Sequence, residues 1–370
     1  MKYALIAAMA ALTAVSGSGE KPLVVHEWGT FTSVSGADGK PMVWRPLQGP
    51  TDLPSFVYRP DYRRGDQANE KSRFVTTIRM ETPVLYFYAG REMDVKVKVD
   101  FPNGAITEWY PRAASMKMRG IDWGTVRVRP GAPDEFPKEE AASHYYPARE
   151  TDAAPIQVKS PGMTQDEKFL FYRGVGWFAP SVSVELQNDL VVVKNPGKQP
   201  VQAILFENRK GAAGFRVLGA VKDEVAVSRP ELSQDKTQIM AELERTLVKQ
   251  GLYEKEASAM LKTWRDSWFE EGVRVFYIVP RASVDAILPL ALDPKPDEVV
   301  RVFVGRVEIL TPEMERAALA IMKRTGEDQA ALWKELEPFG RFAEPLLRRA
   351  TAQLPPAQWT PAVRQLLTNY

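Results

Sequence analysis

The stretch Asp94-Val-Lys-Val-Lys-Val-Asp100 alternates strictly between apolar and charged residues, and the turn sequence Pro102-Asn103-Gly104 follows it. Side chains on an extended strand point alternately to its two faces, so the valines share one face and the lysines the other. One face would be buried and the other exposed, which is typical of antiparallel sheets. We predict that residues 105–110 return after the turn as the antiparallel partner of this strand.

Short segments with strand character extend on both sides of this predicted hairpin. They cover residues 23–34, 83–88, 125–129, 168–172, 181–186, 190–193, 201–207 and 215–221. Their spacing predicts a mainly β fold with an antiparallel β-sandwich body over residues 20–230, built as one large or two smaller sandwiches. Residues 47–71 follow neither the strand nor the helix period and are predicted to form a long loop.

After Pro230 the hydrophobic period changes from two residues to about 3.6, which indicates helices. Two apolar stripes predict two helices, and their members are Ile239, Leu243, Leu247, Ala257, Leu261, Trp264 and Trp268. Residues 231–311 are therefore predicted to be a mixed α/β segment packed on the body, because strand character returns at 273–279 and 299–310. Thr311-Pro312-Glu313 places a cap, a first-turn proline and an acid in order, and predicts an α-helical tail over residues 312–370.

The first 19 residues have the order of a signal peptide: Lys2, an uncharged apolar run over residues 4–15, and then small polar residues. This run is shorter than the ~20 residues that cross a bilayer as a helix. We therefore expect a secreted or periplasmic protein without a permanent membrane anchor. The alternative is an ordinary buried helix at the N-terminus.

Composition excludes several classes of site. The chain has 370 residues and no cysteine, which excludes disulfide bonds and thiolate metal sites. The formal charge is 49 − 47 = +2, so no global field favours a polyanion, and we expect no nucleic-acid partner. The sequence also lacks a phosphate-binding loop, a complete dinucleotide fingerprint and a serine-hydrolase elbow.

The only two histidines, His26 and His144, lie in the two segments where ionisable and aromatic residues are most concentrated. On a regular strand His26 and Glu27 point to opposite faces. They would meet only if the strand bulges, which Gly29 permits nearby. A buried histidine bonded to the backbone is the alternative to a functional His26–Glu27 dyad. If His144 meets His26 in space, the two imidazoles and a carboxylate would suit a divalent metal.

Acids beside aromatic residues supply further candidates, because glycoside hydrolases use two carboxylates and commonly offer flat aromatic surfaces to sugars. The candidate catalytic residues are His26, Glu27, Glu108 and His144. The candidate ligand-binding residues are Trp28, Trp109, Tyr145, Arg149 and Asp152. Packing in the core is the alternative interpretation for most aromatic residues in a chain without disulfides.

Five motifs resemble a family of uncharacterised secreted bacterial proteins. They are HEWGTFTS at 26–33, ETPVLYFY at 81–88, TEWYP at 107–111, EKFLFYR at 167–173 and TWRDSWF at 263–269. The resemblance implies an exported protein with a single architecture through the β and mixed segments, roughly residues 23–312. It implies no activity, so it assigns no role to any residue.

Three functional hypotheses follow. The first is a non-catalytic binding or accessory module that recognises a glycan, a peptide or a cell-envelope component through its loops and aromatic residues. The second is a hydrolase or metal-assisted enzyme that gathers the four candidate catalytic residues at one end of the sandwich. The third is a scaffold whose helical tail packs on a partner. The sequence predicts neither a substrate nor an oligomeric state.

Overall fold

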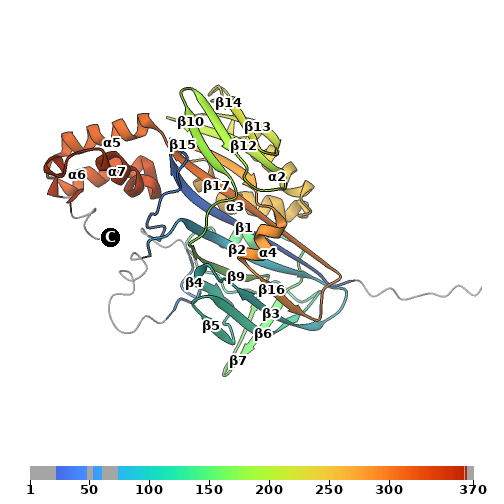
Figure 1. The fold of residues 1–370 in the computed structure, drawn as a ribbon. Helices are drawn as coiled ribbons and strands as arrows, with labels where there is room; N and C mark the ends of the chain where they lie inside the picture. Colours follow the sequence, from blue (N-terminus) through green and yellow to red (C-terminus); the bar gives the residue numbers. More distant parts are fainter. Residues whose placement is uncertain (1–21, 48–52, 61–73, 362, 365–370) are drawn as a thin grey trace, which may run out of the picture.

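The computed structural model describes residues 22–47, 53–60, 74–361, 363 and 364. The predicted signal peptide at residues 1–19 lies outside the described residues, as does most of the predicted loop at 47–71. The described chain is mainly β, with several antiparallel sheets, a group of helices and a helical C-terminal part. The predicted fold class is therefore confirmed (Figure 1).

The strands, in chain order, have the following bounds. They are β1 (Val24–Gly36), β2 (Ile78–Tyr88), β3 (Met93–Asp100), β4 (Gly104–Tyr110), β5 (Ser115–Lys117), β6 (Gly120–Val128), β7 (Ile156–Ser160), β8 (Met163–Glu167), β9 (Leu170–Gly176), β10 (Ser183–Gln187), β11 (Leu190–Lys194), β12 (Val201–Arg209), β13 (Ala212–Val221), β14 (Glu224–Ser228), β15 (Gly272–Ile278), β16 (Leu290–Asp293) and β17 (Glu298–Leu310).

The α-helices of the described residues lie in the second half of the chain. The α-helices are α2 (Lys236–Lys249), α3 (Glu254–Trp268), α4 (Arg281–Ile287), α5 (Pro312–Thr325), α6 (Gln329–Leu336) and α7 (Ala343–Ala352). The part of the chain that the structure describes also has three short 3₁₀ helices, η1 (Tyr146–Arg149), η2 (Glu337–Phe342) and η3 (Pro356–Gln358).

A central sheet of eight strands organises the body, in the order β13-β12-β15-β17-β1-β2-β9-β4. Its neighbouring strands are antiparallel except β1 and β17, which pair in parallel along their whole length. A smaller sheet has the order β10-β11-β14, and another has the order β16-β3-β6-β7-β8 with β5 paired to β6. Because β15 and β17 lie in the middle of the central sheet, the mixed segment at 231–311 contributes central strands to the body.

The two faces of the central sheet are covered differently. One face packs against α2 and α3, and the apolar residues of this layer include Trp28, Tyr86, Phe276, Val302, Ile239, Leu243, Leu247, Trp264 and Trp268. The other face packs against the two smaller sheets, and this layer includes Val25, Phe31, Phe87, Val307, Val95, Val97, Val126, Val184 and Val191. The stripes predicted on the two helices are thus the buried faces of α2 and α3.

The predicted hairpin over residues 94–110 is wrong. β3 has the predicted alternation of buried valines and exposed lysines, but its partners are β6 and β16. β4 is buried along its whole length and pairs with β9 in the central sheet. The turn therefore carries the chain from one sheet to the next. This turn requires glycine, because a Cβ on Gly104 would lie 2.2 Å from the ring of Phe101.

β1 and β2 are irregular where the 26–33 motif contains glycine. The register between the two strands shifts between Trp28 and Thr30. On β2, Thr82 has a φ of 48°, which is unusual for a β-branched residue. A Cβ on Gly29 would lie 2.7 Å from the ring of Phe303, so close packing also requires glycine here. The bulge that the sequence permits near Gly29 is therefore present.

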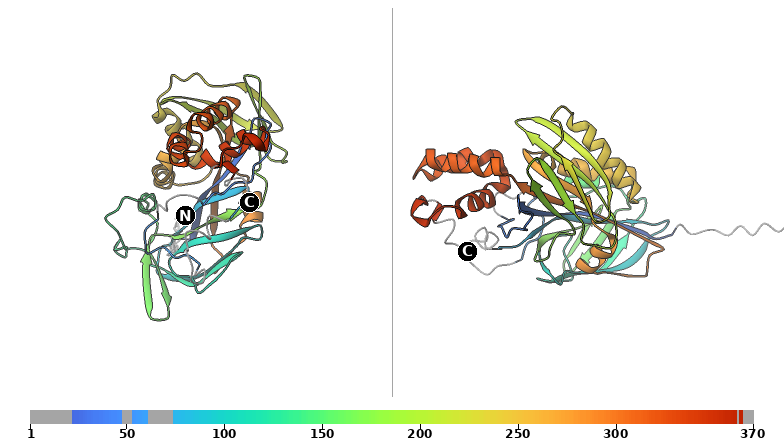
Figure 2. Two further views of the ribbon diagram at one scale, coloured as in Figure 1. Left: turned by 90° about the vertical axis from the view of Figure 1, so that its left-hand side faces the viewer. Right: turned by 45° about the horizontal axis from the view of Figure 1, so that its top comes forward.

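The helical tail packs against one end of the central sheet, and Figure 2 shows its helices grouped beyond that end. Thr311 caps α5, because its hydroxyl accepts a hydrogen bond from the Met314 N–H (3.3 Å), as the sequence predicted. A third apolar cluster joins tail to body, and its members include Val34, Trp44, Leu310, Phe342, Leu346 and Leu347. Arg341 of η2 also donates a hydrogen bond to the Glu81 carboxylate of β2. The tail is thus attached through both apolar packing and a partly buried ion pair.

Glu81 is fully buried where the tail meets the body. Burial raises the pKa of its carboxyl, but the charges of Arg341 and Arg79 and a hydrogen bond from Thr32 outweigh burial. They lower the pKa from its ordinary value of 4.5 to about 2. The ionised form of Glu81 is therefore the one that stabilises the folded chain.

We expect Glu81→Gln to destabilise the protein most at neutral pH. The folded pKa lies below the unfolded one, so the ionised carboxylate contributes stability above about pH 4.5 and loses it as the pH falls towards 2. The full contribution corresponds to about 3 kcal/mol. Urea unfolding from about pH 6 to about pH 2 measures it, and the gap between wild type and E81Q should close in acid. A gap that stays constant over this range would contradict this assignment.

Candidate functional site

The structure separates His26 from Glu27. His26 faces α3, whereas the Glu27 carboxylate lies on the opposite face of β1. There it accepts hydrogen bonds from the Tyr172 hydroxyl (2.6 Å) and from Arg301 Nε (2.5 Å). The bulge at Gly29 leaves the alternation at residues 26 and 27 intact. The functional dyad considered for this motif is therefore not formed, and Glu27 is a buried carboxylate paired with an arginine.

Glu108 and His144 lie away from His26. Glu108 is on β4, and two strands separate β4 from β1, so the two strands are about 14 Å apart. Its carboxylate accepts hydrogen bonds from Arg173 Nε and Nη2, both at 3.1 Å. His144 Nδ1 is 2.7 Å from the Thr263 carbonyl oxygen. The predicted four-residue catalytic site is thus not assembled.

A metal site through both histidines is not formed by the described residues either. His26 contacts Glu256 and His144 contacts Thr263, and these two positions of α3 are seven residues, or about 10 Å, apart along the helix. In the part of the chain that the structure describes, no group of three or more histidine, aspartate or glutamate side chains is arranged to hold a metal ion.

The three candidate aromatic ligands lie in the core. Trp28 and Tyr145 are buried, and Trp109 is only 8% exposed and stacks on Tyr58. Their rings therefore contribute packing area to the body instead of a surface that a ligand can reach. The alternation of β1 and β4 places these indoles in contact with the layers that cover the central sheet.

One buried carboxylate, Glu256 in the first turn of α3, joins three elements of the fold. Its Oε2 accepts hydrogen bonds from His26 Nδ1 on β1 (2.7 Å) and from the Tyr253 backbone N–H (2.8 Å). Its Oε1 accepts a hydrogen bond from the Tyr88 hydroxyl on β2 (2.9 Å). A carboxylate only accepts, so His26 Nδ1 carries a proton. Glu256 thus caps the start of α3 and holds both aromatic side chains in place.

Three rings pack together around this carboxylate. The centroids of the His26 and Tyr253 rings are 4.5 Å apart, and Tyr88 contacts both edge-on at 5.4 and 4.9 Å. Burial, and then the charge of Glu256, raise the pKa of Tyr88, so its hydroxyl stays neutral and donates. Tyr253 is nevertheless 46% exposed. One side of its ring therefore rests on a fixed imidazole while the remainder faces solvent.

A pocket of about 570 Å³ lies beside this aromatic cluster. Tyr88 and Tyr253 line it together with segments 130–134 and 151–155 and with Lys168. Its volume falls in the range of pockets that hold small ligands in proteins. The pocket is thus bounded by an ordered aromatic wall on one side and by two loop segments on the other.

Charged side chains of both signs line this pocket. The buried Lys168 ammonium is 2.6 Å from the Asp134 carboxylate and also donates to the Ala153 carbonyl oxygen. Asp152 is paired with Lys255 at 2.5 Å. Asp134 and Asp152 are themselves exposed, so their carboxylates keep lone pairs that a ligand can use. Of the residues suggested by the sequence, Asp152 is the one that lines the pocket.

Tyr145 and Arg149 anchor the segment of chain that comes just before Asp152. Arg149 donates to Glu167 from Nε (2.9 Å) and Nη2 (2.6 Å), and the Tyr145 hydroxyl donates to the same carboxylate (3.0 Å). Burial raises the pKa of Glu167 and outweighs the opposite effect of Arg149. The guanidinium also lies among four aromatic rings, which favours a cation. These two candidates therefore position a pocket wall and do not line the pocket.

Sequence reasoning missed the residues that build this site, namely Tyr88, Glu256, Tyr253 and Lys168. One signal in the sequence indicated part of this site. Tyr253 and Glu256 come shortly after Gly251 and are three residues apart, which is the spacing of a capping box at the start of a helix. This capping box is hard to recognise in the sequence, because its first residue is a tyrosine and not the usual serine or threonine. His26 and Glu256 are 230 residues apart, and no periodicity in the sequence connects them.

No protein-family model matches the chain, and no curated protein matches it. Among solved structures, the chain is similar to a Danio rerio protein, the Fcho1 Mu homology domain with bound Eps15 peptide. The two are 7% identical, the match covers 78% of this chain and 98% of that one, and the TM-score is 0.28. Among the described residues, no helix has both the length and the apolar character needed to span a membrane.

Proposed function

We propose that the protein is a non-catalytic binding module that holds a saccharide unit of a glycan in the pocket beside Tyr253. The observation that carries this proposal is an exposed aromatic ring that is already fixed. Tyr253 is 46% exposed, while His26 and Tyr88 pack against its ring and Glu256 binds its backbone N–H. A ring that is ordered before binding loses little conformational entropy when a ligand docks on it.

The chemistry of the pocket suits a neutral polyhydroxylated ligand. A sugar ring presents an apolar C–H face and a rim of hydroxyl groups that both donate and accept hydrogen bonds. Tyr253 offers an apolar surface for the face, and the carboxylates of Asp134 and Asp152 accept hydrogen bonds from the rim. Because acids and lysines are paired around the pocket, it has no strong net field that favours a highly charged ligand.

Export is part of the same proposal. The signal-peptide pattern of residues 1–19 supports a secreted or periplasmic protein. In that location the available partner is a glycan of the cell envelope or of the surroundings. The resemblance of the 26–33 motif to secreted bacterial proteins supports this location, and His26 in that motif packs against the Tyr253 ring.

We expect the mature protein to bind at least one class of saccharide on a glycan array. Isothermal titration with the best ligand should then show that Tyr253→Ala weakens binding about tenfold, because the stacking surface is lost. Tyr253→Phe should retain most of the affinity, because it keeps the ring.

Trp177→Ala is the matched control, since Trp177 is 44% exposed and does not line the pocket. Its affinity should equal that of the wild type. An array without hits, or an equal loss in Trp177→Ala and Tyr253→Ala, would contradict the proposed function.

A further inference from the structure

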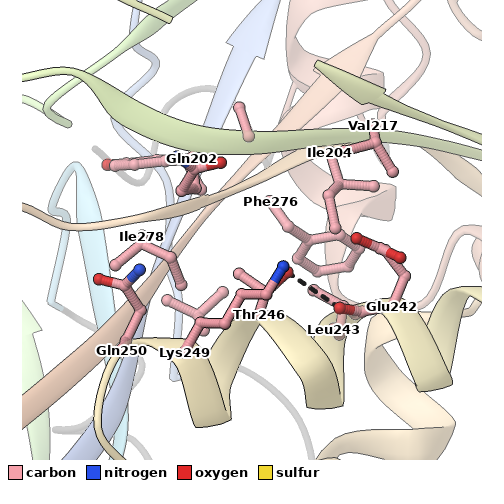
Figure 3. A pocket seen from close by; sticks show the side chains of 13 residues that line it. Gln202, Ile204, Val217, Glu242, Leu243, Thr246, Lys249, Gln250, Phe276 and Ile278 are labelled. Atoms are coloured by element: carbon pink, nitrogen blue, oxygen red, sulfur yellow. Dashed lines mark hydrogen bonds between the residues drawn. The ribbon is translucent and has the colours of Figure 1, made fainter. Parts of the chain in front are cut away.

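A second pocket lies between α2 and the central sheet, on the face that the helices cover (Figure 3). It has a volume of about 250 Å³ and shares no lining residue with the pocket beside Tyr253. Strands β12, β13, β15 and β17 supply one side, and the C-terminal half of α2 supplies the other. Figure 3 shows Phe276 and Ile204 on the sheet side of the cavity and Gln250 reaching from α2 towards Ile278.

The sheet side of this pocket is apolar. Phe276, Ile204 and Val304 are buried core residues, so their lining atoms continue the apolar layer under α2. Val217 on β13 is 52% exposed, which is unusual for a valine on the helix-covered face of a sheet. A ligand with an apolar body would cover this side chain and bury the surface that α2 leaves open.

The rim of the pocket is polar and carries one cation without a partner. Lys249 forms no ion pair or side-chain hydrogen bond with any described residue, and the same holds for the side-chain amides of Gln202 and Gln250. Glu242, two turns earlier on α2, is already paired with Arg245. The free charge at this rim is therefore positive.

We propose that this pocket binds a small amphipathic carboxylate, with its apolar body on Phe276 and its carboxylate at Lys249. A cavity of 150 Å³ accommodates a benzene ring, so this pocket has room for a ligand of about ten non-hydrogen atoms. That size corresponds to one aromatic ring with a short acid chain. Lys249 donates to the carboxylate, and the amides of Gln202 and Gln250 supply further hydrogen bonds.

The charge at the rim separates an acid from other ligands of the same shape. An amine of equal size would place its ammonium beside Lys249 and be repelled. A neutral alcohol would keep the apolar contacts but lose the charge-assisted hydrogen bond. Selectivity for the acid over the amine is therefore the property that identifies this site.

The test is isothermal titration of the full mature chain with 3-phenylpropionate, 3-phenylpropan-1-amine and 3-phenylpropan-1-ol. We expect measurable binding of the acid, weaker binding of the alcohol and none of the amine. Lys249→Met should weaken binding of the acid by about threefold to tenfold and should reduce its preference over the alcohol. Lys236→Met, at the other end of α2, is the matched control and should bind like the wild type.

Val217→Glu provides a second variant at a position whose side chain is 52% exposed. Its carboxylate at the pocket should abolish binding of the acid. The proposal is overturned if the acid does not bind, if acid and amine bind equally, or if Lys249→Met and Lys236→Met behave alike. Saccharide binding should be unchanged in Lys249→Met. The proposal for this pocket and the proposal for the pocket beside Tyr253 can therefore be contradicted independently of each other.

Discussion

Glu308→Ala is expected to lower the free energy of unfolding by about 4 kcal/mol. Glu308 on β17 contacts Arg274 Nε at 2.9 Å and Arg306 Nη2 at 2.9 Å, and all three side chains are fully buried. Burial lowers the pKa of Arg274, and Glu308 acts against this. Without the carboxylate, the two buried guanidinium groups would keep the charge of the partly exposed Glu270, and Arg306 would also keep that of Glu81. An uncompensated buried charge is among the costliest changes in a protein core.

Glu313→Ala is the matched control for this prediction. Glu313 also contacts two arginines, Arg229 and Arg316, but at 3.6 and 3.3 Å and on the exposed surface of α5. Its removal should cost less than about 1 kcal/mol. Urea unfolding followed by tryptophan fluorescence measures both variants. If Glu308→Ala prevents folding, Glu308→Gln, which keeps the volume, should still show a clear loss. Equal losses for Glu308 and Glu313 would contradict this account of the buried cluster.

Glu256→Ala should have two effects, on stability and on binding. It removes the hydrogen bonds that Glu256 accepts from His26, Tyr88 and the Tyr253 N–H, and leaves one buried and two partly buried donors without their acceptor. We expect a loss of about 4 kcal/mol in the free energy of unfolding, from three bonds to one charged group. Because the Tyr253 ring then loses its fixed support, saccharide affinity should fall as well.

Glu254→Ala tests whether these effects are specific to the cluster. Glu254 lies in the first turn of the same helix, but its side chain is exposed. Its removal should cost only the interaction with the helix dipole, about 0.5 kcal/mol, and leave binding unchanged. Thermal and urea unfolding report stability, and titration with the ligand of the wild type reports binding. A Glu256 variant that is destabilised but binds normally would show that the cluster stabilises the fold without positioning Tyr253.

Local periodicity predicted much of the fold. The valine alternation of β3, the apolar stripes of α2 and α3, and the Thr311 cap of α5 all depend on neighbours within a few residues. The pairing of β3 with β4 was wrong because a strand's pattern shows which face is buried but does not identify the partner. The parallel pairing of β1 with β17 joins residues more than 270 positions apart, and no local pattern in the sequence indicates it.

The candidate site was harder to predict, and the acids show why. Glu27 and Glu108 stand beside tryptophans in the sequence, which suggested catalytic carboxylates. In the fold they pair with Arg301 and Arg173, which are 274 and 65 residues away. A buried carboxylate needs a compensating partner, and for these two acids that partner is an arginine far away in the sequence. Asp152, an exposed acid that the sequence suggested as a ligand-binding residue, lines the pocket and is paired with Lys255.

The position of a bound saccharide tests the central claim most directly, namely that Tyr253 is a fixed platform for a glycan. A crystal structure of the mature protein with its best array ligand should show a sugar ring against the Tyr253 ring. Its hydroxyl groups should lie within hydrogen-bond distance of Asp134 or Asp152, and His26, Tyr88 and Glu256 should keep the contacts described above. A ligand bound elsewhere, with the Tyr253 pocket empty, would contradict the account.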